Sequence, residues 1–235
     1  MNFKHRALAC ALCILGSASP AMAVDLPGGF SATGGASIVS DYRFRGISLS
    51  GNDPAVQGTV TISHSSGFYA GTWASTLEDT DLYGDTEIDL YAGWAKNIAP
   101  GTQVDVGVAY YAYPNGRSAA GNSDYAESYA KLSHTIATVK GTVGAAYAWG
   151  QSAIGERDNL YLFADAAAGV PGTPFTLRGH AGRSEGSLSP QTYVDWSLGV
   201  DATFGPLTLG ASYLDSDLDR PVGKGALVFS FGAAF

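Results

Sequence analysis

The chain has 235 residues, with 13 Lys and Arg against 21 Asp and Glu and a net charge of −8. This balance argues against nucleic acid as a partner, because phosphate binding requires a basic surface. Glycine and tyrosine are abundant, with 31 and 13 residues, and only 14% of the residues are charged. Such a composition favours a membrane barrel over a secreted enzyme.

Residues 1–23 have the pattern of a secretory signal peptide. Basic residues near the N-terminus precede a short apolar run, and an A-x-A cleavage site ends at Ala23. The apolar run is too short to form a transmembrane helix. Both cysteines, Cys10 and Cys13, lie in this leader. We therefore expect a mature domain of residues 24–235 without disulfide or thiol chemistry.

The mature part divides at turn signals into twelve segments, each near the length that a tilted strand needs to cross a bilayer. The expected strands are residues 30–48, 54–64, 67–77, 86–97, 102–113, 123–135, 138–149, 157–169, 174–184, 191–204, 206–215 and 225–235. The fold class predicted from this division is all-β: a transmembrane antiparallel β-barrel of about 12 strands, after an N-terminal signal peptide.

The connections between these segments alternate in length. Short ones are expected at 65–66, 98–101, 136–137, 170–173 and 205–206, and long polar ones at 49–53, 78–85, 114–122, 150–156, 185–190 and 216–224. Short turns at one rim and long loops at the other are typical of outer-membrane barrels. Both termini then lie at the rim of the short turns, and the number of strands is even.

Several segments alternate between apolar and polar residues with period two, which gives each strand two different faces. In 191–204, for example, Trp196 and Leu198 alternate with Asp195 and Ser197. The last strand carries an apolar row that ends on an aromatic residue: Leu227, Phe229, Phe231, Ala233 and Phe235. We expect this row to face lipid, and 225–235 to close the barrel against 30–48 and to be the segment that the barrel-assembly machinery recognises.

Charged residues fall on the opposite, inward face. The candidate lumen residues are eight acidic and five basic ones: Asp41, Arg43, Arg45, Glu87, Asp89, Asp105, Glu127, Lys131, Lys140, Asp165, Arg178, Asp195 and Asp201. They are compatible with a narrow channel that weakly prefers cations, or with a closed interior in which opposite charges pair. In the segment SDYRFRGIS (40–48), Arg43 and Arg45 could bind an anionic solute or pair with acidic groups across the barrel.

The same segment carries a family resemblance. SDYRFRGIS, followed by DPAVQG (53–58) and SGFYAGTWAS (66–75), resembles the N-terminal signature of the TorF-type porin family of proteobacterial outer-membrane proteins, also labelled Gcw_chp. Three later segments and the Phe-ended last strand fit as well: EIDLYAGW (87–94), YYAYP (110–114) and DWSLGV (195–200). The resemblance implies an outer-membrane barrel with porin activity, no catalytic residues and no defined substrate.

The expected function is therefore passive diffusion of small solutes or ions, with outer-membrane lipid and lipopolysaccharide as surroundings. The alternative is a non-conducting structural or adhesive barrel that acts through its surface loops. A barrel hydrolase is disfavoured because none of His64, His134 and His180 has a persuasive catalytic partner in the sequence. No cofactor or metal is expected, since the acidic run 215–219 lacks the glycine and the closing glutamate of a calcium loop.

Overall fold

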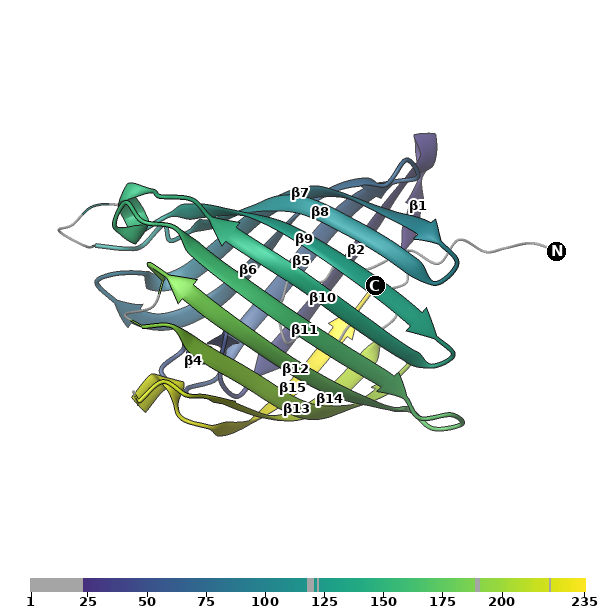
Figure 1. Ribbon diagram of the computed structural model, residues 1–235. Coiled ribbons are helices and arrows are strands. Elements are labelled where there is room, and N and C mark those ends of the chain that lie inside the picture. Colours follow the sequence, from purple (N-terminus) through teal and green to yellow (C-terminus); the bar gives the residue numbers. More distant parts are fainter. Residues whose placement is uncertain (1–22, 118–120, 122, 189–190, 220) are drawn as a thin grey trace.

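A computed structural model of the chain shows a closed antiparallel β-barrel of twelve tilted strands (Figure 1). The structure describes residues 23–117, 121, 123–188, 191–219 and 221–235, so the predicted signal peptide lies, except for Ala23, outside the described residues. The barrel strands are β2 (Phe30–Val39), β5 (Ala55–His64), β6 (Phe68–Thr80), β7 (Gly84–Ala99), β8 (Thr102–Ala112), β9 (Tyr125–Ile136), β10 (Val139–Ala148), β11 (Asn159–Gly169), β12 (Phe175–Gly186), β13 (Tyr193–Phe204), β14 (Leu207–Ser216) and β15 (Ala226–Ala234). The predicted fold class is confirmed.

Each strand pairs with its sequence neighbour, and the last strand pairs with the first. Residues 230–234 of β15 lie antiparallel to residues 35–39 of β2. Beyond β15, the backbone N–H and C=O of Phe235 each bond to Gly34 at 2.9 Å. The short strand β1 (Val24–Leu26), which the sequence analysis did not anticipate, pairs with Phe30–Ala32 further along β2. The predicted closure of the barrel by 225–235 is therefore confirmed, and no long edge of β2 is left open.

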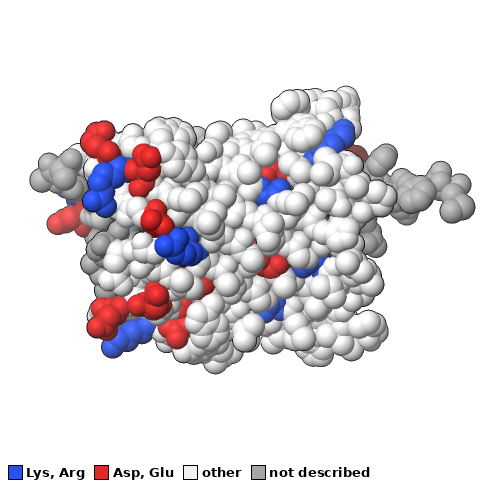
Figure 2. All heavy atoms as spheres, viewed as in Figure 1, with Lys and Arg blue, Asp and Glu red and all other residues white. Residues whose placement is uncertain are grey.

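The two faces of the wall differ as the period-two pattern predicts. Leu198 on β13 is 63% exposed, whereas its neighbours Ser197 and Asp195 are 4% and 2% exposed. Phe229 and Phe231 of β15 also point outward. Figure 2 shows charged side chains gathered at the end of the barrel that carries the long connections, while most of the wall is neither acidic nor basic. The result is a barrel with an apolar outside and a polar inside.

Two expectations about elements need correction. Residues 40–48 do not continue the first strand, because the chain turns inward after Val39. The expected long connection at 78–85 is a tight one, because β6 and β7 extend beyond the predicted bounds and Thr80 pairs with Gly84. Three single 3₁₀ turns also occur, η1 (Pro27–Gly29), η2 (Ser152–Ile154) and η3 (Pro221–Gly223). No helix among the described residues is long and apolar enough to cross a membrane.

Tyrosine rings lying over interior glycines explain part of the unusual composition. Gly93 of β7 is directly opposite Tyr69 of β6, and a Cβ built on Gly93 would lie 2.4 Å from the Tyr69 hydroxyl. Gly71 is related to Tyr91 in the same way, with 2.6 Å between the built Cβ and the hydroxyl. Glycine thus makes room for large rings that fill the barrel from inside.

Candidate functional site: the barrel interior

The connection between β2 and β5 forms a small hairpin that folds into the barrel. Its strands are β3 (Arg43–Phe44) and β4 (Ile47–Ser48), joined by Arg45 and Gly46. Both tip residues have left-handed backbone angles, with φ of 50° and 80°. A Cβ on Gly46 would lie 2.8 Å from the Cβ of Asp195, so the close approach to the wall also requires glycine there. We call residues 40–53 the inner hairpin.

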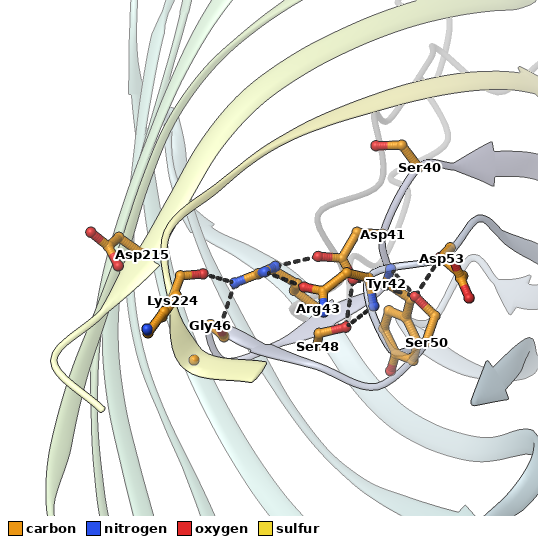
Figure 3. A network of polar contacts seen from close by, with 12 residues as sticks. Ser40, Asp41, Tyr42, Arg43, Gly46, Ser48, Ser50, Asp53, Asp215 and Lys224 are labelled. Atoms are coloured by element: carbon orange, nitrogen blue, oxygen red, sulfur yellow. Dashed lines mark hydrogen bonds and ion pairs between the residues drawn. The ribbon is translucent and has the colours of Figure 1, made fainter. Parts of the chain in front are cut away.

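Arg43 ties the inner hairpin together near its base (Figure 3). Its Nε donates to Asp41 at 2.5 Å, its Nη1 to the carbonyl oxygens of Gly46 and Lys224, and its Nη2 to Asn52. Asp41 also accepts hydrogen bonds from the hydroxyls of Ser48 and Ser50. Arg43 therefore pairs with a residue of its own segment. The sequence left open that Arg43 pairs with an acidic group across the barrel. The structure corrects this alternative, because Arg43 pairs with Asp41 of the same segment instead.

Arg45 does reach the far wall. Its Nη2 lies 2.6 Å from Oε2 of Glu127 on β9, and its guanidinium carbon lies 4.3 Å from the ring centre of Tyr161 on β11. It also lies 4.6 Å from the ring centre of Phe44. β9 and β11 are about half a barrel away from β2 in the strand order, so the inner hairpin bridges the lumen from one side to the other.

Two small spaces lie beside this bridge. One cavity of about 30 Å³ lies between the inner hairpin and the β7–β11 wall, and its lining includes Arg45, Asp89, Tyr111 and Glu127. A second of about 30 Å³ lies on the side of β2 and β15. Each volume is near that of a single water molecule, so neither of these two spaces admits a solute larger than water beside the inner hairpin.

The wall that Arg45 contacts is strongly acidic. Glu87 and Asp89 project from β7 and Glu127 from β9, and each is at most 2% exposed. Tyrosine hydroxyls solvate part of this group: Tyr111 donates to Glu127 at 3.1 Å and Tyr113 to Glu87 at 3.3 Å. One carboxylate oxygen of each residue nevertheless has no hydrogen-bond partner among the described residues. Buried acceptors of this kind are costly unless a donor arrives.

Other predicted lumen residues form separate ion pairs along the wall. Lys131 lies 2.9 Å from Asp105, and Arg178 lies 2.8 Å from Asp201. Lys140 is exposed near the β9–β10 turn, at the rim of the short turns. The structure therefore distributes the predicted charges over several local pairs and one acidic wall.

His180 of β12 has partners that the sequence analysis did not foresee. Its Nδ1 lies 2.7 Å from Asp165, and its Nε2 lies 3.0 Å from Asp195 and 2.8 Å from the hydroxyl of Tyr161. Residues 15 positions away on β11 and β13 become direct neighbours of His180 through strand pairing, which the sequence alone does not show. Together these groups form a hydrogen-bonded cluster under Arg45.

Inward tyrosines, which the charge pattern of the sequence did not predict, are also part of the site. Tyr111 and Tyr125 stack at 4.7 Å, and Phe44 packs edge-on against Tyr111 at 5.7 Å. The signal was available, because these tyrosines occupy the same alternating positions as the acidic residues of their strands. The interior thus combines aromatic faces with carboxylates, a chemistry that suits cations and hydroxylated solutes.

Comparison with solved structures places this barrel in a known class of folds. The NanC porin matches with a TM-score of 0.56 and 11% identity, covering 87% of this chain and 98% of NanC. The KdgM porin matches with a TM-score of 0.58 and 5% identity, covering 87% of this chain and 98% of KdgM. An outer-membrane channel of the COG4313 group from Pseudomonas putida F1 matches with a TM-score of 0.48 and 11% identity, covering 90% of this chain and 97% of the channel. The matches to NanC and KdgM show that the protein has the barrel fold of these two porins.

The family follows from the sequence match. Residues 24–233 match the family described as bacterial protein of unknown function, Gcw_chp, and the chain belongs to this family. This confirms the Gcw_chp part of the resemblance seen in the sequence. No curated protein matches the chain.

Proposed function

We propose that the protein is a TorF-type porin of a proteobacterial outer membrane, a channel for passive diffusion that is closed by its inner hairpin in the conformation described here. The observation that carries the proposal is the two-sided wall: an apolar exterior around a charged, tyrosine-rich interior in a fully closed barrel. A wall of this kind is stable in lipid because every strand is paired and charges face inward. The protein acts without catalysis, cofactor or nucleic acid.

The acidic wall favours cations as the preferred ions. Glu87, Asp89 and Glu127 face the lumen near the Arg45 guanidinium, while Lys131 and Arg178 pair with Asp105 and Asp201. Fixed carboxylates attract cations and repel anions along a narrow path. A KdgM structure is described as a complex with disordered oligogalacturonate, which is a polyanion. The excess of carboxylates in this chain argues against such a solute here.

The inner hairpin also favours a second candidate function, a non-conducting outer-membrane barrel that acts through its surface loops. The bridge between Arg45 and Glu127 supports this candidate because it closes the lumen. The two candidates differ in whether the hairpin moves.

Planar bilayers separate these functions. Purified folded protein is compared with a variant in which residues 43–48 are replaced by two glycines. A channel closed by its hairpin gives small or infrequent steps for the wild type and larger, persistent ones for the variant, with a reversal potential in a KCl gradient that reports cation preference. The absence of conductance steps in both proteins would overturn the proposed channel, and anion selectivity would overturn the proposed cation preference.

A further inference from the structure

The guanidinium group of Arg45 lies in a pocket with the chemistry of a cation-binding site. Its central carbon is 4.6 Å from the ring centre of Phe44 and 4.3 Å from that of Tyr161. Glu127 pairs with it at 2.6 Å and is itself 1% exposed. Aromatic faces with a buried carboxylate are how proteins recognise guanidinium and ammonium ligands. The pocket is thus occupied by a side chain of the protein itself.

Arg45 leaves part of the hydrogen-bonding capacity of this pocket unused. Its Nε and Nη1 have no hydrogen-bond partner among the described residues, and the same is true of Oε1 of Glu127 and Oδ1 of Asp89. Arg45, Glu127 and Asp89 line the same small cavity. Guanidinium normally binds a carboxylate through two parallel hydrogen bonds, but Arg45 makes a single one here. The acidic groups therefore retain unused capacity for a donor that approaches in a better geometry.

The backbone at Arg45 gives a reason for the poor fit. Its φ of 50° lies in the left-handed region, which costs a non-glycine residue energy. Because Arg45 is attached to the backbone of the hairpin, its side chain has little freedom to align with Glu127, whereas a free solute could align fully. The hydrogen bonds of Arg43 do not involve Glu127, and only one of them, to the carbonyl oxygen of Gly46, reaches the tip. The tip can therefore leave the pocket by breaking that one bond, while the bonds to Asp41, Asn52 and Lys224 keep the base in place.

We infer that Arg45 is a tethered stand-in for the solute, and that the pocket formed by Glu127, Asp89, Tyr111 and Tyr161 is a lumen binding site for organic cations that carry a guanidinium or primary ammonium group. Such a solute displaces Arg45, moves the tip of the inner hairpin aside and opens the path. This inference rests on the proposed channel function and names its solute class.

Calorimetric titration of methylguanidinium into the detergent-solubilised, folded full-length barrel tests the pocket directly. In R45G the competing side chain is removed, and glycine accepts the positive φ without strain. We expect R45G to bind at least about tenfold more tightly than the wild type, which corresponds to about 1.4 kcal/mol. R45G/E127Q should lose this gain. R45G/D201N changes the lumen charge equally but at a different wall, and should keep it.

Equal binding by the wild type and R45G, or tight binding retained in R45G/E127Q, would overturn the inference. Conductance measured on the same R45G sample separates the two proposals. Binding without channel steps leaves the pocket standing and overturns the channel, whereas channel steps without binding do the reverse. Folding is checked by the heat-dependent gel shift of the barrel. If R45G does not fold, R45N serves instead, because asparagine also tolerates a positive φ.

Discussion

Arg45 and Glu127 are 82 residues apart in the sequence and meet inside the barrel at 2.6 Å. Each is almost fully buried. The contact joins the tip of the inner hairpin to a strand on the far wall. Breaking this link should therefore affect both stability and permeability.

The substitution Glu127→Gln removes the negative partner of Arg45 but keeps the shape of the side chain. A buried guanidinium left without its carboxylate costs about 3–5 kcal/mol. We expect a loss of this order in the free energy of unfolding, measured by urea titration in lipid vesicles. The double variant R45G/E127Q is the control, because it leaves no uncompensated cation. Should E127Q cost the same in both backgrounds, the ion pair would not be the source of the effect.

Gly93→Ala should disturb the packing of tyrosine over glycine. The added Cβ would lie 2.4 Å from the hydroxyl of Tyr69 and 2.6 Å from the carbonyl oxygen of Val106. Overpacking of a tight interior costs about 1–3 kcal/mol. The matched control is Gly141→Ala on β10, where nothing lies within 4 Å of the built Cβ. Equal unfolding midpoints for G93A and G141A would contradict this account of the glycines.

Leu198→Arg tests the outward face. Leu198 lies in the middle of β13 and is 63% exposed, and an Arg at the midplane of a lipid-facing wall costs about 2–4 kcal/mol. The unfolding free energy in vesicles should fall by this amount. Leu82→Arg is the control, because Leu82 is exposed in the β6–β7 connection at the outer rim and should change stability by less than about 0.5 kcal/mol. A tolerated L198R would show that this wall faces water.

Deletion of Phe235 tests the seam. Its two backbone hydrogen bonds to Gly34 contribute about 0.5–1.5 kcal/mol each. We expect slower closure of the barrel in a refolding time course followed by the gel shift, together with a loss of about 1–3 kcal/mol in stability. Phe204→Ala removes another outward aromatic beside a short turn without touching the seam, and should refold at the wild-type rate. Normal refolding of the truncated chain would refute a role of this residue in closure.

Local pattern was sufficient for much of the fold. The alternation in 191–204 placed Leu198 outside and Asp195 inside, because a strand sends successive side chains to opposite faces whatever its partners are. Gly-rich and Pro-rich turns located nearly every strand within a few residues. The barrel closure followed as well, since a terminal apolar strand in lipid needs a partner for its backbone groups.

The inner hairpin shows where local pattern failed. The segment 40–48 alternates like a strand, so it was expected to extend β2. It turns inward because Asp41 accepts hydrogen bonds from Arg43, Ser48 and Ser50, and because Gly46 permits a tip pressed against Asp195. The hydrogen bonds of Asp41 are local to the hairpin, whereas the approach of Gly46 to Asp195 becomes available only when β13 forms the wall beside it.

Periodicity and chain order are enough to predict a twelve-stranded barrel with an apolar outside, a charged inside and a seam at Phe235. Which charges meet depends on how the strands pair and close in three dimensions. Arg45 contacts Glu127 and Tyr161 because closure of the sheet brings distant strands to face each other across one narrow lumen. His180 contacts Asp165 and Asp195 because strand pairing places them on the two adjacent strands. Period two indicates on which side a residue lies, whereas its partner depends on strand order and register.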